Sequence, residues 1–218
     1  MFKKIFNHLK KDPVPHDFIS SFSYWINRYA KGGNSGAGSY NHLAAFKAEV
    51  INSFVKNNNV NSVIEFGAGD GNQLCFADYP QYTGVDISPT AVELCQTLFH
   101  NDPTKKFMLL SDYKETRCEL ALSLDVIFHL VEDEVFSDYM HRLFRAATRF
   151  VIIYSSNTSE NSQPGAPHVR HREFTHWVNN NASDWRLLQR IANPYPYNGD
   201  YKTTSFSDFY LYQNRTIK

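Results

Sequence analysis

Apolar and polar positions along the chain are patterned in a way that predicts strands and helices in turn. Helical spacing predicts four helices, over residues 18–30, 40–55, 88–100 and 132–145. Short apolar runs predict five strands, at residues 60–66, 82–87, 106–110, 120–125 and 150–154. Strands that alternate with helices favour parallel pairing in one sheet that helices cover on both faces.

The C-terminal part of the chain changes character. Residues 185–191 and 206–212 are strand-like, and only a loop rich in Pro, Tyr and Gly joins them. Such a connection favours an antiparallel hairpin. The predicted fold is therefore α/β, with a seven-stranded, mostly parallel sheet, a C-terminal antiparallel hairpin and additional N-terminal helices. We expect residues 1–57 to form an N-terminal helical segment and residues 58–218 to form the main domain.

The charge balance narrows the range of partners. Lys and Arg number 22 and Asp and Glu number 22, so the formal net charge is zero. Nucleic-acid binding usually requires a basic excess, so we expect no nucleic-acid partner. The Lys-rich residues 1–11 could lie against an acidic membrane surface. They lack the long apolar run of a signal peptide or a membrane-spanning helix, so we expect no integral membrane segment.

Cysteine and aromatic content add two further expectations. The three cysteines, Cys75, Cys95 and Cys118, are odd in number and fall within predicted elements, which suits a reducing cytoplasm better than a disulfide framework. Aromatic residues make up 15% of the chain. Most of them are expected in the core, but the N-terminal and C-terminal thirds hold enough to build a pocket for a ring-bearing or sugar-like ligand.

A glycine-rich turn follows the strand predicted at residues 60–66. Gly67, Gly69 and Gly71 occupy alternate positions there, where glycine lets the backbone approach a ligand and the next helix offers free N–H groups. Asp86 ends the next strand about 20 residues after the first glycine, a spacing at which a carboxylate reaches ribose hydroxyls. A dinucleotide fingerprint would need glycine at position 72, which is Asn72, so NAD is not expected.

This arrangement resembles the first motif of class I S-adenosylmethionine-dependent methyltransferases, in which an acid such as Glu65 precedes the glycines. The resemblance continues through Asp86 and the segment from Leu124 to Leu130. The family's sheet is Rossmann-like, with the same seven-strand plan and terminal hairpin. The resemblance therefore implies S-adenosylmethionine as the cofactor.

The resemblance also implies a role for residues around the cofactor. The glycines would let the methionine moiety lie against the turn, Glu65 would orient its ammonium group through water, and Asp86 would bind both ribose hydroxyls. Asp112 would accept from the adenine amine, although a solvated loop acid is an equal interpretation. The full expected set is Tyr24, Arg28, Tyr29, Glu65, Gly67, Ala68, Gly69, Asp86, Ile87, Asp112, Tyr113, Leu124 and Asp125.

Three histidines are candidates for the catalytic base. A hydroxyl acceptor must lose its proton, and histidine is the natural base near neutral pH. His129 follows the fourth strand, and His168 and His171 follow the fifth; each alone is also compatible with a surface position. We rank His129 first because a short loop fixes it after Asp125. The histidines lack partners at zinc-site spacing, so we expect no metal.

Residues 18–39 join an aromatic helix to a glycine-rich loop. This segment resembles the leading part of small bacterial methyltransferases associated with surface-polysaccharide synthesis. It could close as a lid, with Tyr24, Arg28 and Tyr29 facing the cofactor, or it could be a helix packed on the sheet with a flexible connector.

The sequence favours methyl transfer to a small polar acceptor, above all a hydroxyl of a sugar or glycan precursor. One alternative is an N-methyltransferase that acts on a small amine or a protein side chain. Another is a non-catalytic partner protein that binds the cofactor.

Overall fold

The computed structural model describes residues 18–161 and 166–216. The expectation that residues 1–11 contact an acidic membrane surface lies outside these ranges. Within them, no helix has both the length and the apolar character needed to cross a bilayer.

Seven strands form one sheet in the order β3-β2-β1-β4-β5-β7-β6. All neighbouring pairs are parallel except β5 with β7 and β6 with β7. The strands are β1 (Val63–Phe66), β2 (Tyr82–Asp86), β3 (Lys105–Leu109), β4 (Cys118–Leu124), β5 (Ala147–Ser155), β6 (Trp185–Ile191) and β7 (Asp208–Asn214). The predicted seven-stranded sheet with its antiparallel C-terminal hairpin is confirmed.

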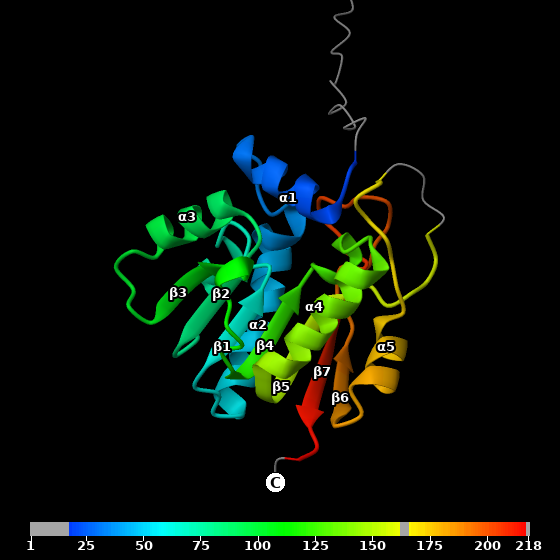
Figure 1. Cartoon of the computed structure of the whole chain (residues 1–218). Helices are drawn as coiled ribbons and strands as arrows, with labels where there is room; N and C mark the ends of the chain where they lie inside the picture. Colours follow the sequence, from blue (N-terminus) through cyan, green and yellow to red (C-terminus); the bar gives the residue numbers. More distant parts are fainter. Residues whose placement is uncertain (1–17, 162–165, 217–218) are drawn as a thin grey trace, which may run out of the picture.

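Helices cover both faces of the sheet and one of its ends. Figure 1 shows α4 in front of the sheet, α2 behind it and α1 above the carboxyl ends of the parallel strands. The α-helices are α1 (Ser21–Ala30), α2 (Asn41–Asn57), α3 (Pro89–Leu98), α4 (Asp133–Ala146) and α5 (Phe174–Asn181). Short 3-10 helices are η1 (Ala37–Ser39), η2 (Gln73–Phe76), η3 (Leu110–Asp112) and η4 (Ile127–His129).

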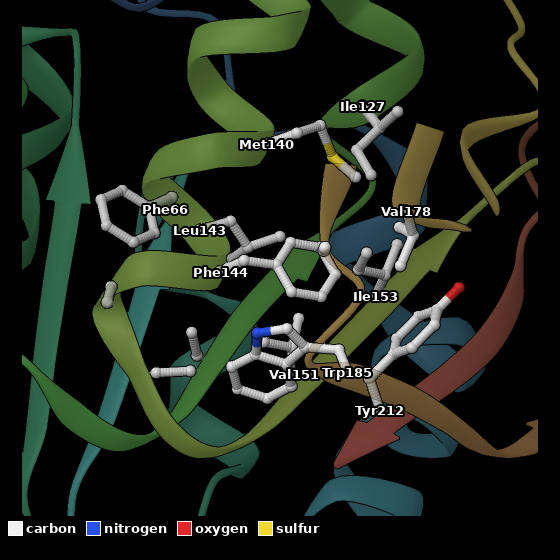
Figure 2. Packing of buried hydrophobic residues seen from close by; sticks show 14 of the residues in the cluster. Phe66, Ile127, Met140, Leu143, Phe144, Val151, Ile153, Val178, Trp185 and Tyr212 are labelled. Carbon is white, nitrogen blue, oxygen red and sulfur yellow. The ribbon is translucent and has the colours of Figure 1, made fainter. Parts of the chain in front are cut away.

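The sheet separates two hydrophobic cores. On one face Met140, Leu143 and Phe144 of α4 pack with Val178 of α5 against the strands (Figure 2). On the other face Ile51 and Val55 of α2 pack against β1, β4, β5 and β7. Burial on both faces explains why the central strands are continuous apolar runs and not alternating ones.

Most predicted elements are present, with shifted ends. Helix α1 starts at Ser21, not at residue 18, because the Ser20 hydroxyl accepts from the Ser23 N–H and caps the helix. Strand β5 extends to residues 147–155, and β7 covers 208–214 where 206–212 was predicted. Helix α5 was not predicted, because its three consecutive asparagines are weak helix formers.

Candidate functional site

A cavity of about 320 Å³ lies where the strand order reverses, between β1 and β4. Ligands in open α/β sheets bind outside the carboxyl ends of strands at such a switch point. The ends of β1, β2 and β4 form its floor, and α1 forms its roof. Its size falls within the usual range for small-molecule sites.

The glycine turn adopts a backbone that side chains cannot easily follow. Gly67 and Gly69 have φ angles of 88° and 61°. A Cβ at position 67 would lie 2.5 Å from Cγ2 of Val126, and one at position 69 would lie 2.3 Å from Oγ of Ser35. Glycine is therefore required both by the conformation and by the close packing of the turn.

Asp86, at the end of β2, is fixed beside this turn. Its carboxylate accepts from the Gly69 N–H and from the Ser88 N–H, both at 2.9 Å. Burial raises the pKa of Asp86, and the two backbone donors oppose that rise. A buried carboxylate held in this way on the cavity wall can accept from hydroxyl groups of a ligand.

Glu65, near the end of β1, is a second buried acid on the wall. The Tyr82 hydroxyl donates to its Oε2 at 2.7 Å. Burial raises the pKa of Glu65 to about 7, while Tyr82 and the nearby Lys47 lower it. Glu65 is thus poised to lose its proton when a positive group enters the cavity.

Helix α2 and its N-cap residue Tyr40 hold three residues of the cavity wall in place, and two of these, Asp70 and Gln73, were not assigned to the site by the sequence analysis. The Tyr40 hydroxyl donates to Asp70 Oδ2 at 2.8 Å, and Gln73 Nε2 donates to the Ala44 carbonyl at 3.0 Å. Lys47 Nζ, fully buried, lies 2.8 Å from Oδ2 of Asp125. Positions 44 and 47 share one face of α2 and Tyr40 is its N-cap, so the start of α2 braces this end of the cavity.

The roof of the cavity is tied down at both ends. At the start of α1, the Ser21 N–H and hydroxyl donate to the Glu132 carboxylate at 2.9 and 2.6 Å. At its end, the Tyr29 hydroxyl lies 2.9 Å from Oγ of Ser35. The Ser35 N–H donates in turn to Asp70 at 2.8 Å, which joins the glycine-rich loop to the glycine turn.

Two of the three predicted histidines lie together beside the roof. His129 packs edge-on against Trp25 at 4.8 Å, and its ring stacks with that of His168 at 5.5 Å. His129 Nδ1 lies 3.0 Å from the His168 carbonyl. Because a carbonyl only accepts, Nδ1 carries the proton and Nε2 carries the lone pair.

The histidine rings are kept neutral by their surroundings. Burial lowers the pKa of His129 to about 3 and that of His168 to about 4. His171 lies apart, with Nδ1 2.7 Å from the Ser156 hydroxyl, and burial lowers its pKa as well.

The predicted site residues divide into two groups by position. Those on the cavity wall are Tyr29, Glu65, Gly67, Ala68, Gly69, Asp86, Ile87, Leu124, Asp125 and His129. Those off the wall are Tyr24, Arg28, Asp112, Tyr113, His168 and His171. Asp112 is exposed to solvent, and Leu110 takes the wall position after β3.

Two arginines near His171 have structural partners. Arg170 and Arg172 both pair with Asp133 at 2.9 Å. They also donate to the backbone carbonyls of Leu130 and Val131, which fixes the connection that carries His129. Within residues 18–161 and 166–216, no three His, Cys, Asp or Glu side chains are grouped closely enough to hold a metal ion.

Solved methyltransferase structures share this fold. The N-methyltransferase NodS from Bradyrhizobium japonicum WM9, in complex with S-adenosyl-L-homocysteine, is 10% identical over 89% of this chain and 98% of its own, with a TM-score of 0.68. Magnesium protoporphyrin IX methyltransferase from Synechocystis PCC 6803, with bound S-adenosylmethionine, is 15% identical over 90% and 98%, with a TM-score of 0.62. No curated protein matches the chain.

The fold and the site define a class I, Rossmann-like methyltransferase. Residues 64–152 match the family described as a methyltransferase domain. Over these residues and in its fold the chain is similar to S-adenosylmethionine-dependent methyltransferases, and it is an enzyme that uses this cofactor. The residues on the cavity wall fit the cofactor. Asp86 can accept hydrogen bonds from its hydroxyls, and the acid-lined end beside Glu65 suits its ammonium group.

Proposed function

We propose that this enzyme methylates a hydroxyl of a small polar acceptor, a sugar or glycan precursor, held under α1 beside His129. The observation that carries this proposal is the neutral imidazole on the cavity wall, whose Nε2 has no hydrogen-bond partner within residues 18–161 and 166–216. The contact between Nδ1 and the His168 carbonyl supports a fixed ring orientation. A positioned acceptor nitrogen is what a hydroxyl substrate requires as its oxygen becomes bonded to carbon.

The roof suits a ring-shaped acceptor. Phe22, Trp25 and Tyr29 of α1 all line the cavity, and Phe22 is partly exposed to solvent. Aromatic faces pack well against the apolar face of a ring, while polar groups on its rim reach hydrogen-bond partners. This combination favours a sugar over an extended, purely apolar acceptor.

S-adenosylmethionine supplies an electrophilic methyl group bonded to a positively charged sulfur. In the proposed step the acceptor oxygen bonds to the methyl carbon, the carbon–sulfur bond breaks, and the hydroxyl proton passes to His129 Nε2. The low pKa of His129 keeps that nitrogen unprotonated near neutral pH. The same low pKa means that proton transfer accompanies bond formation and does not precede it. Alignment of the reactants is the main contribution expected from the cavity.

An amine acceptor is the second candidate. It is favoured by the weak proton affinity of His129, because an amine that reacts as its free base needs no strong base in the site. The acceptor would then be a small amine or a protein side chain, and His129 would only position it.

A panel of acceptors and histidine variants separates the two candidates. Product S-adenosylhomocysteine is measured for sugars, sugar nucleotides and small amines with wild type and with His129→Ala, His168→Ala and His171→Ala. For a hydroxyl acceptor we expect His129→Ala to lower turnover by about 100-fold while cofactor affinity is kept. His176→Ala, an exposed histidine on α5, is the matched control. Methylation of amines alone, with near-full turnover in all variants, would favour the second candidate.

We further propose that residues 1–57 act together with the methyltransferase domain of residues 58–218, and that residues 18–39 form its lid. The ties between Ser21 and Glu132 and between Tyr29 and Ser35 support a roof that closes over the cofactor. The free thiols of Cys75, Cys95 and Cys118 support a cytoplasmic location.

A further inference from the structure

The side chain of Gln73 presents an unmet hydrogen-bond requirement on the cavity wall. The residue is 8% exposed, and within the described ranges its Oε1 atom is buried without a hydrogen-bond partner. A buried carbonyl oxygen left unpaired costs free energy, so native structures almost always supply it with a donor. Because Gln73 lines the cavity, a bound ligand can be that donor.

The orientation of the Gln73 amide is fixed by α2. Its Nε2 donates to the Ala44 carbonyl at 3.0 Å. Since a backbone carbonyl cannot donate, the NH₂ group must point to Ala44 and the oxygen must be the other end. The neighbouring contacts of Tyr40 with Asp70 and of Lys47 with Asp125 hold α2 in register with the wall.

The two aspartates at this end of the cavity already accept hydrogen bonds from the protein. Asp70 accepts from the Ser35 and Asn72 N–H groups and from Tyr40. Both oxygens of Asp125 are engaged, one by Lys47 and one by the Ser207 hydroxyl. Gln73 Oε1 and the carboxylate of Glu65 are therefore the acceptors best placed to receive a ligand donor in this region.

The cofactor has three kinds of donor: the ribose hydroxyls, the adenine amine and the ammonium group. Asp86 is the last residue of β2, where it accepts from the Gly69 N–H of the glycine turn, and is expected to take the hydroxyls. Glu65 and Gln73, the latter held by α2, line the cavity where the amino-acid moiety is expected. The donor that remains for this end is the ammonium group.

We propose that Gln73 Oε1 accepts a hydrogen bond from the ammonium group of the cofactor, and that α2 sets the amide orientation that this bond requires. Gln73 is then a cofactor-specificity residue that distinguishes ligands with the amino-acid moiety from those without it. A reversed amide would place its NH₂ group against the ammonium and oppose binding.

The test compares two ligands by calorimetry, without turnover. S-adenosylhomocysteine carries the ammonium group, and 5′-methylthioadenosine lacks the amino-acid moiety. In Gln73→Met we expect affinity for S-adenosylhomocysteine to fall about tenfold or more, because a hydrogen bond to a charged group is lost. Affinity for 5′-methylthioadenosine should stay within about twofold. Gln96→Met is the matched control, because the exposed Gln96 also donates to a backbone carbonyl, that of Phe107.

Two outcomes would overturn the proposal. In one, Gln73→Met binds S-adenosylhomocysteine as tightly as wild type. In the other, both ligands lose affinity equally, which would mean that Gln73 supports the structure of the cavity and does not bind the ammonium group. Neither ligand involves a methyl acceptor, so this test is independent of the proposed function.

A second readout uses the wild-type enzyme and does not depend on the folding of the variant. The side-chain amide signal of Gln73 is followed by NMR during titration with each ligand. We expect it to shift with S-adenosylhomocysteine and to remain in place with 5′-methylthioadenosine. Equal shifts with both ligands, or a shift with neither, would contradict the proposal.

Discussion

The glycine-turn end of the cavity and its roof are built in opposite ways. The turn and Asp86 come from one strand–turn–strand segment, and the Gly69 N–H bonds directly to the Asp86 carboxylate. The roof joins α1 to distant parts of the chain, with Ser21 reaching Glu132 across 111 positions. One end is set by local backbone, whereas the other exists only when remote segments pack together.

This difference in construction matches what the two ligands, the cofactor and the methyl acceptor, require of the cavity. The cofactor is the same in every turnover, so a rigid local turn serves it well. The acceptor, its methylated product and the spent cofactor must enter or leave in each turnover, and a roof held by a few side-chain hydrogen bonds can open for them. The predictions below test whether the two ends are as separate as this comparison implies.

Removing Lys47 should have the largest effect, because its buried ion pair joins α2 to Asp125 after β4, 78 positions away. Lys47→Met leaves the Asp125 carboxylate without its cation in a mostly buried position. We expect the free energy of unfolding to fall by about 3–5 kcal/mol. Urea denaturation measures this, with Lys56→Met on the exposed part of α2 as the control. A loss below about 1 kcal/mol would show that α2 does not brace the cavity.

The Asp86→Ala variant tests the glycine-turn end of the cavity without changing the roof. It removes the expected acceptor for the ribose hydroxyls and leaves the Gly69 and Ser88 N–H groups without it. We expect S-adenosylhomocysteine to bind more weakly by about 1–3 kcal/mol, measured by calorimetry. Unchanged affinity would remove Asp86 from the cofactor site.

The sequence predicted the local end far better than the roof. The glycines and Asp86 lie close together in sequence, so their spacing alone was informative. Ser21, Asp70 and Gln73 gain their roles from contacts that no local pattern encodes. Lys47 did leave a signal, since it lies four residues after Leu43 and four before Ile51, within the apolar face of α2.

The pH dependence of cofactor binding should report Glu65. Its pKa of about 7 in the free protein means that it is mostly protonated at pH 6 and mostly ionised at pH 8. If its ionised form attracts the ammonium group, affinity for S-adenosylhomocysteine should rise about tenfold between these pH values. Glu65→Gln is the control, and its affinity should be flat over this range. An equally steep rise in Glu65→Gln would assign the effect to another group.

The raised pKa of Glu65 affects the stability of the fold in the opposite direction, because stability falls as pH rises. Because burial raises the pKa of Glu65 above its ordinary value, the folded protein holds a proton that the unfolded chain has lost. The contribution of Glu65 to stability is therefore fully present below its unfolded pKa of about 4.3 and is lost as pH rises to about 7. Thermal unfolding without ligand should show this decline in wild type and not in Glu65→Gln.

Loosening the roof should have the smallest effect. Glu132→Ala removes the carboxylate that accepts from the Ser21 N–H and hydroxyl at the start of α1. We expect amide hydrogen exchange in residues 21–24 to speed up about fivefold, consistent with the loss of about 1 kcal/mol. Bound S-adenosylhomocysteine should slow exchange over residues 18–39 in wild type. Equal exchange with and without it would mean that this segment is not a lid.

The most direct test of the central claim is a crystal structure of the enzyme with S-adenosylhomocysteine. The account predicts that the ribose hydroxyls lie within hydrogen-bond distance of Asp86. It also predicts that the sulfur points toward the part of the cavity wall formed by Trp25 and His129, beside which the acceptor is expected. A sulfur directed away from His129, or a ribose held by another acid, would contradict the assignment of the two ends.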